Sequence, residues 1–340
     1  MLILATSISG SGRKEYLNGF AEYAKRYGKR VKIYFVGDLI FEHAAEIGVH
    51  ITPENVLNAN PHVINAVRAA VFEDILGKIT ADVKKYDCIV VSIHGFFYWK
   101  KFFRRAYDYF YLNQLSPNLF VTFIDGGAAM LERLNERRQW KSEKLTLHEI
   151  LVWQNVEVET TASIAEFQRK DFYAVPTGQP FSTLYKLAFI PRMEPVYVSM
   201  PMTHLKDPKD KKRVDKFVEN LNKYFTVFDP RAIEIKTGIA SVFAKQKDRA
   251  SDYNHTVLRD LYWLIRQSKK TIAFYPKVVS SPGVINELRE AFETNKDVWL
   301  IYPEKAASPF LTYFCGRIFS SEKEFFRFLD KELKLPKAPL

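Results

Sequence analysis

Cysteine is scarce in this sequence: there are two in 340 residues, Cys88 and Cys315. They form no CxxC pair and no Cys/His cluster, so a disulfide framework or a structural zinc site is not expected. Glycine and proline are also few, at 14 and 16 residues, and no segment is of low complexity. These shortages argue against a fibrous or disordered chain and indicate an ordinary globular protein.

Long hydrophobic runs are also missing. No run approaches the roughly 18 apolar residues that a transmembrane helix needs. The apolar run at the N-terminus is short, from Leu2 to Ala5, and no basic segment precedes it, unlike a secretory signal peptide. We therefore expect a cytoplasmic protein without a membrane partner.

Positive charge is in excess, since 50 Lys and Arg residues against 39 Asp and Glu residues give a net charge of +11. Such a surface attracts anions, including nucleotides, nucleic acids and acidic membranes. The segment 96–112 mixes aromatic rings with Lys101, Arg104 and Arg105, a composition that can also bind nucleic acid. A lid or dimer surface with its cations at the edge is the favoured interpretation, so nucleic acid is a compatible but not a favoured partner.

Short β-rich runs alternate with longer helical patterns, which predicts βα units and parallel sheets. In the first half, strands are expected at 2–6, 31–36, 88–93, 119–124 and 172–175, and helices at 13–27, 38–47, 61–79 and across 127–169. Pro191 and Pro195 bracket a short linker, and the alternation then restarts. In the second half, strands are expected at 196–200, 225–228, 271–275 and 297–302, and helices at 209–223, 252–267, 283–294 and 322–333. The prediction is an α/β protein with two domains, 1–190 and 195–335.

A loop rich in serine and glycine, SISGSGRK (7–14), joins the first expected strand to the first helix. Backbone N–H groups in such a loop, backed by a helix N-terminus, can enclose a phosphate. The loop departs from the GxxxxGK[ST] pattern, because Ser7, Arg13 and Lys14 stand at the first Gly, the Lys and the Ser/Thr. A plain tight turn is the alternative interpretation. On the phosphate interpretation, the candidate ligands are Ser9, Gly10, Ser11, Gly12, Arg13 and Lys14.

Further segments follow this loop in the order found in archaeal-type adenylate kinases: VGDLIFEHAAEIGV (36–49), SIHG (92–95), ERLNERRQW (132–140), HEILVWQN (148–155) and FYAVPTGQP (172–180). Residues 1–185 therefore resemble that family of P-loop proteins. The resemblance implies a parallel sheet that binds ATP or GTP with Mg²⁺, with Arg137 and Arg138 as cations that clamp phosphates. Asp87 and Asp125 are the candidate partners of Mg²⁺, but neither is secure, and we predict no protein metal site.

The second half contains the motifs VYVSMP (196–201), DLYWL (260–264) and SPGVINE (281–287). In the last motif Glu287 lies one turn into an expected helix, at the sheet edge where open α/β folds bind ligands. A capping serine with an exposed glutamate would give the same local pattern. The three motifs together resemble those of nucleoside 2-deoxyribosyltransferases and of the related deoxynucleoside 5′-monophosphate hydrolases. Met200 departs from the glycine of that family's first turn, and Thr203 and His204 occupy the region where the hydrolases carry an arginine.

This second resemblance covers residues 195–335 and implies a smaller, Rossmann-like domain. It implies that Glu287 is the nucleophile, Asp260 its acid/base partner and Tyr197 a positioning residue. It implies no cofactor for the glycosidic step, and a homodimer formed through the C-terminal domain, with one serine contributed across it. The implied substrate contacts are Ser199, Ser281, Gly283 and, across the dimer, Ser308.

Taken together, the two resemblances predict an enzyme that cleaves or exchanges the N-glycosidic bond of a nucleoside, a nucleotide or an NAD-like substrate. The kinase-like half would bind a regulatory nucleotide. Two alternatives stay open: a nucleotide kinase with an accessory C-terminal half, and a nucleotide-sensing or nucleic-acid-binding protein whose two sites have decayed. The intact Asp260 and Glu287 favour the first hypothesis, and the altered loop counts against the kinase.

Overall fold

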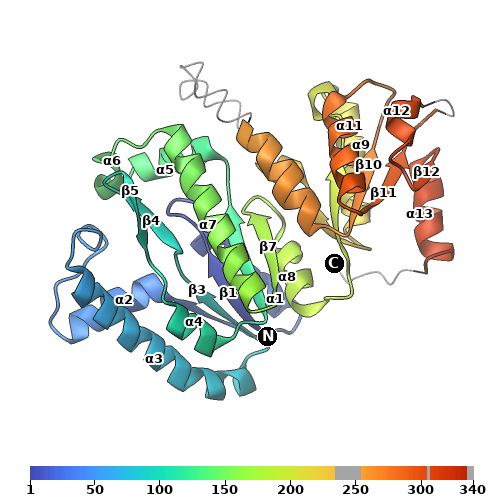
Figure 1. The fold of residues 1–340 in the computed structure, drawn as a ribbon. Coiled ribbons are helices and arrows are strands. Elements are labelled where there is room, and N and C mark those ends of the chain that lie inside the picture. The colour runs from blue at the N-terminus through green and yellow to red at the C-terminus, as the bar shows by residue number, and fades with distance from the viewer. Residues whose placement is uncertain (234–253, 305–306, 335–340) are drawn as a thin grey trace. The chain divides into compact units, whose positions relative to one another are not determined.

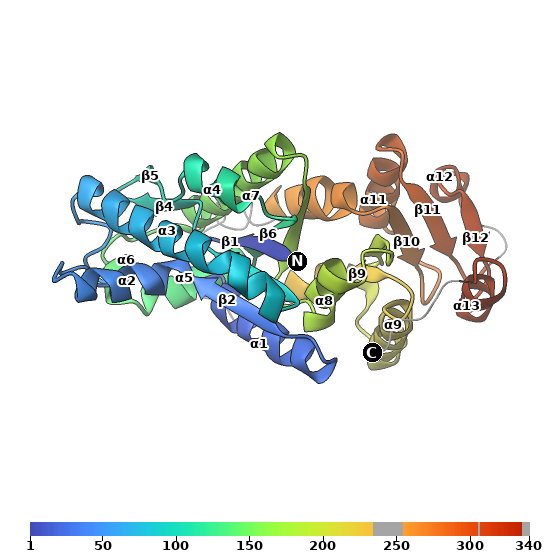
Figure 2. The same ribbon diagram turned by 90° about the horizontal axis from the view of Figure 1, so that it is seen from below.

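The computed structural model describes residues 1–233, 254–304 and 307–334, which fold into two compact units. The first unit comprises Met1–Phe181 and the second begins at Ser182. Each unit contains a five-stranded parallel sheet with helices on both faces (Figures 1 and 2), which confirms the predicted α/β class. The domain ranges 1–190 and 195–335 stay predictions. No helix within the described ranges is both long and apolar enough to cross a membrane.

The first sheet has the strand order β2-β3-β1-β6-β7. Its strands are β1 (Leu2–Thr6), β2 (Val31–Phe35), β3 (Cys88–Ser92), β6 (Leu119–Ile124) and β7 (Asp171–Pro176). Its helices are α1 (Arg13–Arg26), α2 (Val36–Glu46), α3 (Pro61–Lys85), α4 (Tyr109–Leu115), α5 (Gly127–Asn135), α6 (Arg138–Lys141) and α7 (Leu147–Phe167). Every residue of β1, β3 and β6 is buried, because helices cover both faces of the sheet.

The carboxyl end of β1 is the place in this sheet where a ligand is expected. β1 pairs with β3 on one side and with β6 on the other. The strand order therefore reverses at β1, and open α/β sheets bind ligands at such a switch point. The loop from Ser7 to Gly12 lies between β1 and α1, at this end of the strand.

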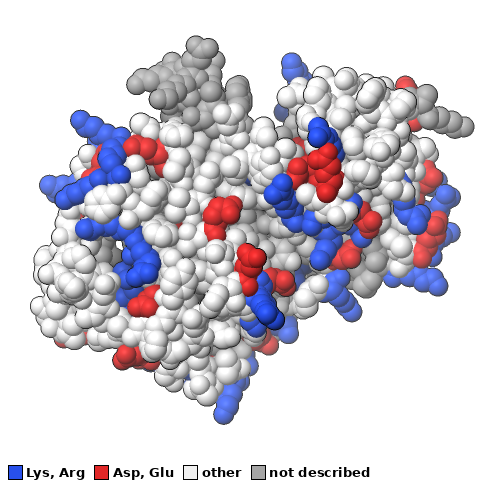
Figure 3. Space-filling view, in the orientation of Figure 1, with Lys and Arg blue, Asp and Glu red and all other residues white. Residues whose placement is uncertain are grey.

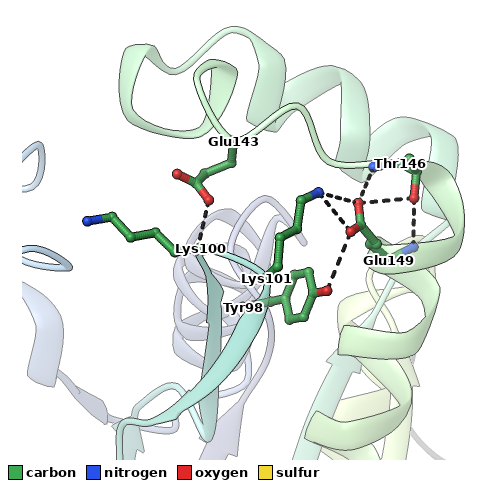
Figure 4. A network of polar contacts seen from close by, with 6 residues as sticks. All are labelled: Tyr98, Lys100, Lys101, Glu143, Thr146 and Glu149. Atoms are coloured by element: carbon green, nitrogen blue, oxygen red, sulfur yellow. Dashed lines mark hydrogen bonds and ion pairs between the residues drawn. The ribbon is translucent and has the colours of Figure 1, made fainter.

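An antiparallel hairpin, β4 (Phe96–Trp99) and β5 (Phe102–Arg105), follows β3 and was not predicted. Figure 4 shows how its tip is held: the Lys100 N–H donates to Glu143 Oε2 at 2.8 Å, and Lys101 Nζ donates to Glu149 Oε1 at 2.7 Å. Lys and Arg side chains gather around the hairpin on the face shown in Figure 3. Glu143 and Glu149, which are far from the hairpin in the sequence, thus hold its basic turn in place.

The helical stretch expected across 127–169 divides into α5, α6 and α7. Thr146 starts the last of these, because its hydroxyl accepts the Glu149 N–H while the Glu149 carboxylate accepts the Thr146 N–H. About two turns after Glu149, on the buried side of α7, Glu157 accepts the N–H groups of Gly95 and Phe96 at 2.7 and 2.8 Å. A buried carboxylate therefore joins α7 to the start of the hairpin.

The second sheet has the order β12-β11-β10-β8-β9. Its strands are β8 (Pro195–Ser199), β9 (Thr226–Phe228), β10 (Lys270–Phe274), β11 (Asp297–Ile301) and β12 (Arg317–Phe319). Its helices are α8 (Phe181–Phe189), α9 (Pro208–Leu221), α11 (Pro282–Glu293), α12 (Pro309–Thr312) and α13 (Glu322–Lys331). The unit also has the 3₁₀ turns η1 (Met202–His204) and η2 (Pro230–Ile233) and the π-helix η3 (Leu258–Ile265). Counted along this unit the order is 2-1-3-4-5, whose switch point lies between the first and third strands, here β8 and β10.

Two differences from the sequence analysis concern this unit. The short edge strand β12 was not predicted. The helix predicted at 252–267 begins outside the described residues, and in its described part the π-helix η3 lies between the α-helical residues 254–257 and 266–267.

A buried lysine fixes α8 to the rest of the second unit. Lys186 Nζ lies 2.6 Å from Asn222 O, 3.1 Å from Asn222 Oδ1 and 3.2 Å from Phe225 O. Burial lowers the pKa of Lys186 to about 7. Three acceptors at the carboxyl end of α9 and before β9 thus depend on one side chain from α8.

Replacing Gly95 by Ala is expected to destabilise the first unit. The added Cβ would lie 2.9 Å from Glu157 Oε2, inside a packed and hydrogen-bonded contact, which should cost about 1–3 kcal/mol. Gly77→Ala is the matched control, since Gly77 lies inside α3 with open space around it and the change should stabilise by about 0.5–1 kcal/mol. Thermal melting of the full chain measures both, and unchanged melting of Gly95→Ala would contradict the contact.

Candidate active site

The side chains of β8 divide between a core and a site. Successive residues of a strand face opposite sides of the sheet. Val196 and Val198 join the hydrophobic core on one side. Tyr197 and Ser199 therefore face the other side, at the end of β8 that borders the switch point with β10. The motif VYVSMP thus supplies two hydroxyl groups to the sheet edge where a ligand is expected.

Glu287 meets these two hydroxyl groups from α11. Val284, Leu288 and Ala291 form the buried stripe of this helix, and the spacing places Glu287 beside them. The Tyr197 hydroxyl donates to Glu287 Oε1 at 3.1 Å, and the Ser199 hydroxyl donates to Glu287 Oε2. Each oxygen of the half-buried carboxyl group thus has a hydroxyl partner from β8.

Asp260 lies in the π-helix η3, a rare conformation that is frequent at functional sites. Its neighbour Arg259 donates from Nε to Asp260 Oδ1 at 2.8 Å and from Nη2 to Oδ2 at 3.2 Å. Both residues are only 5% exposed, so the ion pair is shielded from water. A π-helix has more residues in each turn than an α-helix, so the angle between successive side chains is smaller. The side chains of Arg259 and Asp260 can therefore contact each other although they are neighbours in the sequence.

The burial of these groups controls their protonation. Burial, and then the negative charge of Asp260, raise the pKa of Glu287 to about 8, although Ser199, Tyr197 and Arg259 oppose the rise. Burial also raises the pKa of Asp260, against the effect of Arg259. The pKa of Tyr197 is raised for the same reason and by both carboxylates. At neutral pH the site therefore holds a proton on Glu287.

Sequence reasoning missed Arg259, His255 and Tyr275. His255 is buried with its ring 5.4 Å from that of Trp263, and burial together with the Arg259 charge lowers its pKa to about 4. Tyr275 follows β10, and burial above all raises its pKa, with smaller effects from Tyr302 and Glu287. For Arg259 and His255, nearness to a motif in the sequence could have identified them. Arg259 directly precedes DLYWL, and His255 is about one helical turn before it.

The remaining predicted contacts of this site lie at two helix starts. Ser281 is buried and caps α11, its hydroxyl accepting the Val284 N–H at 3.4 Å. Gly283 is exposed, and a Cβ there would meet nothing within 4 Å. Ser308 is exposed at the start of α12, and no hydrogen bond joins it to Glu287 in the part of the chain described. Its role across a homodimer stays a prediction.

In the first unit, Gly10 and Gly12 take the left-handed φ values of 82° and 84° that glycine adopts freely. Within the described ranges, no acceptor is recorded for the N–H groups of Ser9, Gly10 and Gly12, whereas the Ser11 hydroxyl donates to the Ser7 hydroxyl at 2.8 Å. Free N–H groups next to a helix N-terminus suit an anion. The loop could therefore bind a phosphate through its backbone.

The cations of this loop are directed elsewhere. Arg13 donates to Ile93 O, and its Nη2 lies 3.4 Å from His94 Nε2. Lys14 pairs with Asp38 at 2.5 Å. Burial lowers the pKa of Arg13 to about 10, while the charge of Glu157 opposes this. Arg13 therefore ties the loop to the end of β3 in this structure.

The arginines predicted to bind phosphates and the aspartates considered as partners of Mg²⁺ lie at different places in the first unit. Burial and the charge of Arg13, and to a smaller extent that of Arg137, lower the pKa of His94 to about 3, so Arg137 lies near the loop. Arg138 is exposed at the start of α6. Asp125 pairs with Arg133, and Asp87 precedes β3, at the sheet edge opposite the loop. No metal-binding group of three His, Cys, Asp or Glu residues occurs in the described residues.

Comparison with known proteins adds little to this geometry. No family model and no curated protein matches the chain. A Clostridium botulinum CMP N-glycosidase, BcmB, is 19% identical with a TM-score of 0.23, over 40% of this chain and 99% of that one. A Thermus thermophilus protein is 10% identical with a TM-score of 0.30, over 51% and 87% of the two chains. An uncharacterized Eubacterium ventriosum protein is 14% identical with a TM-score of 0.27, over 55% and 97%. TM-scores this low carry no argument about activity.

Replacing Tyr197 by Phe is expected to raise the pKa of Glu287 above its value of about 8. The reason is that the hydroxyl stabilises the ionised carboxylate by donating to it. Carboxyl-carbon NMR titration measures the midpoint, with Glu287→Gln identifying the signal. Tyr302→Phe removes another buried hydroxyl at the end of β11 without a recorded bond to Glu287, and it should leave the midpoint unchanged. A lower midpoint in Tyr197→Phe would refute the contact.

Proposed function

We propose that this chain cleaves or exchanges the N-glycosidic bond of a nucleoside, a nucleotide or an NAD-like substrate, with Glu287 as the nucleophile. The observation that carries the proposal is the position of Glu287. Its two oxygens are held by Tyr197 and Ser199 at the β8/β10 switch point, near a second buried carboxyl group on Asp260. The resemblance of the three motifs supports the same chemistry.

In the first step, an ionised Glu287 oxygen bonds to C1′ while the C1′–N bond breaks and its electron pair leaves with the base. Asp260 is the proposed donor of a proton to the departing base. In the second step, water or a new base bonds to C1′, the carboxylate of Glu287 leaves, and the proton of the incoming group returns to Asp260. Water gives hydrolysis and a second base gives exchange.

The charge of the site suits this reaction. In the reactive arrangement, with Asp260 protonated, the ionised Glu287 is held by two hydroxyl groups, and no ion pair joins it to a cation among the described residues. The transition state at C1′ resembles an oxocarbenium ion and is positive. The unfavourable charge is therefore relieved as the reaction proceeds, which lowers the barrier more than it strengthens substrate binding.

Glu287→Gln is expected to reduce base release by on the order of 10³-fold or more, because an amide oxygen is a poor nucleophile. The fold should be kept, since Gln has the same shape. Glu290→Gln is the matched control: Glu290 lies three residues further along α11 and pairs with Arg266 at 2.7 Å, outside the site.

Chromatography of nucleosides, nucleotides and NAD incubated with the full chain measures released base. Undiminished release by Glu287→Gln would refute the assignment of the nucleophile. Absence of release from every substrate by the wild-type chain would refute the proposed reaction.

The first unit supports a second proposal, the binding of an ATP or GTP phosphate by the Ser7–Lys14 loop in a regulatory role. Its basis is the free N–H groups at the end of β1. Catalysis of phosphoryl transfer is the less favoured alternative, because Lys14 stands where a hydroxyl would bind Mg²⁺. Binding through backbone groups does not need that hydroxyl.

Arg137→Ala is expected to weaken ATP binding by roughly tenfold, the loss of one charge-assisted contact. Arg138→Ala is the matched control, because both arginines are exposed but Arg137 is the one whose charge lowers the pKa of His94. Calorimetry on the full chain measures both variants. Equal ATP affinities of the two variants would show that Arg137 does not contact the nucleotide. Absence of ATP and GTP binding to the wild type would refute the proposal.

A further inference from the structure

Arg259 has no role in the reaction as described so far, yet it lies in the site. Its side chain is almost fully buried, and two of its nitrogens are bonded to the carboxylate of the residue that follows it. A third nitrogen, Nη1, lies 3.5 Å from Ile233 O. A buried two-point ion pair of this kind fixes both partners in orientation.

The groups that face Glu287 come from several elements. Tyr197 and Ser199 face it from β8, Asp260 and Arg259 from η3, and Tyr275 from the end of β10. On α11 itself, Glu290 is paired with Arg266 of the helix that contains η3. Asp297 of β11 pairs with Lys270 at the other end of the strands, and α12 has no titratable residue. Among the described residues, Arg259 is therefore the cation whose charge stabilises ionised Glu287.

The two carboxyl groups differ in what their partners permit. A guanidinium only donates hydrogen bonds, so a proton on Asp260 would displace one of the two bonds from Arg259. A hydroxyl donates or accepts, so Ser199 or Tyr197 can turn to accept a proton carried by Glu287. Protonation is thus accommodated at Glu287 and opposed at Asp260 by hydrogen-bond geometry alone.

We propose that Arg259 is a positioning residue that keeps Asp260 ionised and leaves the exchangeable proton of the pair on Glu287. The importance of this proton position for catalysis rests on the proposed function. The proposed reaction needs the proton on Asp260 and an ionised Glu287, whereas Arg259 favours the proton on Glu287. Arg259 therefore sets the fraction of the enzyme that is ready to react. The rise of the Glu287 pKa to about 8, caused first by burial and then by the charge of Asp260, agrees with this order of ionisation.

Titration of Glu287 in the full-length protein tests the inference without substrate. Arg259→Gln removes the donors that keep Asp260 ionised, so Asp260 should take up the proton of the pair and the midpoint of Glu287 should fall. Asp260→Asn removes the negative charge and leaves that of Arg259, so the midpoint should fall. Each shift should be about one pH unit or more, as for carboxyl groups that lose a nearby charge. Arg266→Gln, an exposed arginine on the same helix, should leave the midpoint unchanged.

The double variant Arg259→Gln/Asp260→Asn protects the test against misfolding, because it leaves neither charge buried without a partner. Its midpoint should lie above that of Asp260→Asn. Equal midpoints for these two variants, or a midpoint of Arg259→Gln above that of the wild type, would overturn the inference. Arg259→Lys keeps the charge without the two-point contact and should recover most of the wild-type midpoint.

Base release, measured on the same proteins, separates this inference from the proposed function. The expected midpoint shifts without any base release would support the role of Arg259 and refute the reaction. Base release with unchanged midpoints would support the reaction and refute the role of Arg259. In an active enzyme, Arg259→Gln should change the pH at which the rate is highest, which a purely structural role would not do.

Discussion

Two carboxyl groups and one guanidinium share a space in the second unit from which water is largely excluded, and the arrangement around them follows from this. A buried charge is costly unless it is paired and hydrogen-bonded. Arg259 satisfies Asp260, while Glu287 receives hydroxyl groups instead of a cation. The alternation of β8, the cap at Ser281 and the π-helix each bring one of these partners to the switch point.

The first unit also contains charged groups that are shielded from water, and they are stabilised in another way. Glu157 is fully buried and Arg13 partly buried, and backbone N–H groups of Gly95 and Phe96 stabilise the Glu157 carboxylate. The charged side chains are thus used to hold the loop and the hairpin together. What the sheet edge offers to a ligand is backbone, which binds an anion without adding a buried charge of its own.

Much of this architecture follows from local sequence. Continuous apolar runs mark β1, β3 and β6, and alternation marks β8, because helices cover the sheets in a regular way. The hairpin was missed because its turn residues, Lys100 and Lys101, have the positive φ values usually found with glycine or asparagine. Arg259 was missed because adjacent residues of an α-helix face different directions, and the sequence shows no sign of a π-helix. The orientation of Arg13 depends on Ile93, distant in the chain.

The buried lysine of α8 bears on how the second half can be expressed by itself. A fragment begun at residue 192, within the proline-bracketed break in the sequence, would lack Lys186 and leave the acceptors of Asn222 and Phe225 without their donor. Unsatisfied buried acceptors cost about 1–3 kcal/mol each, a large share of the stability of a small domain. A fragment begun at Ser182 keeps α8 and its lysine. The boundary that matters for dissecting the gene therefore lies about a helix earlier than composition indicates.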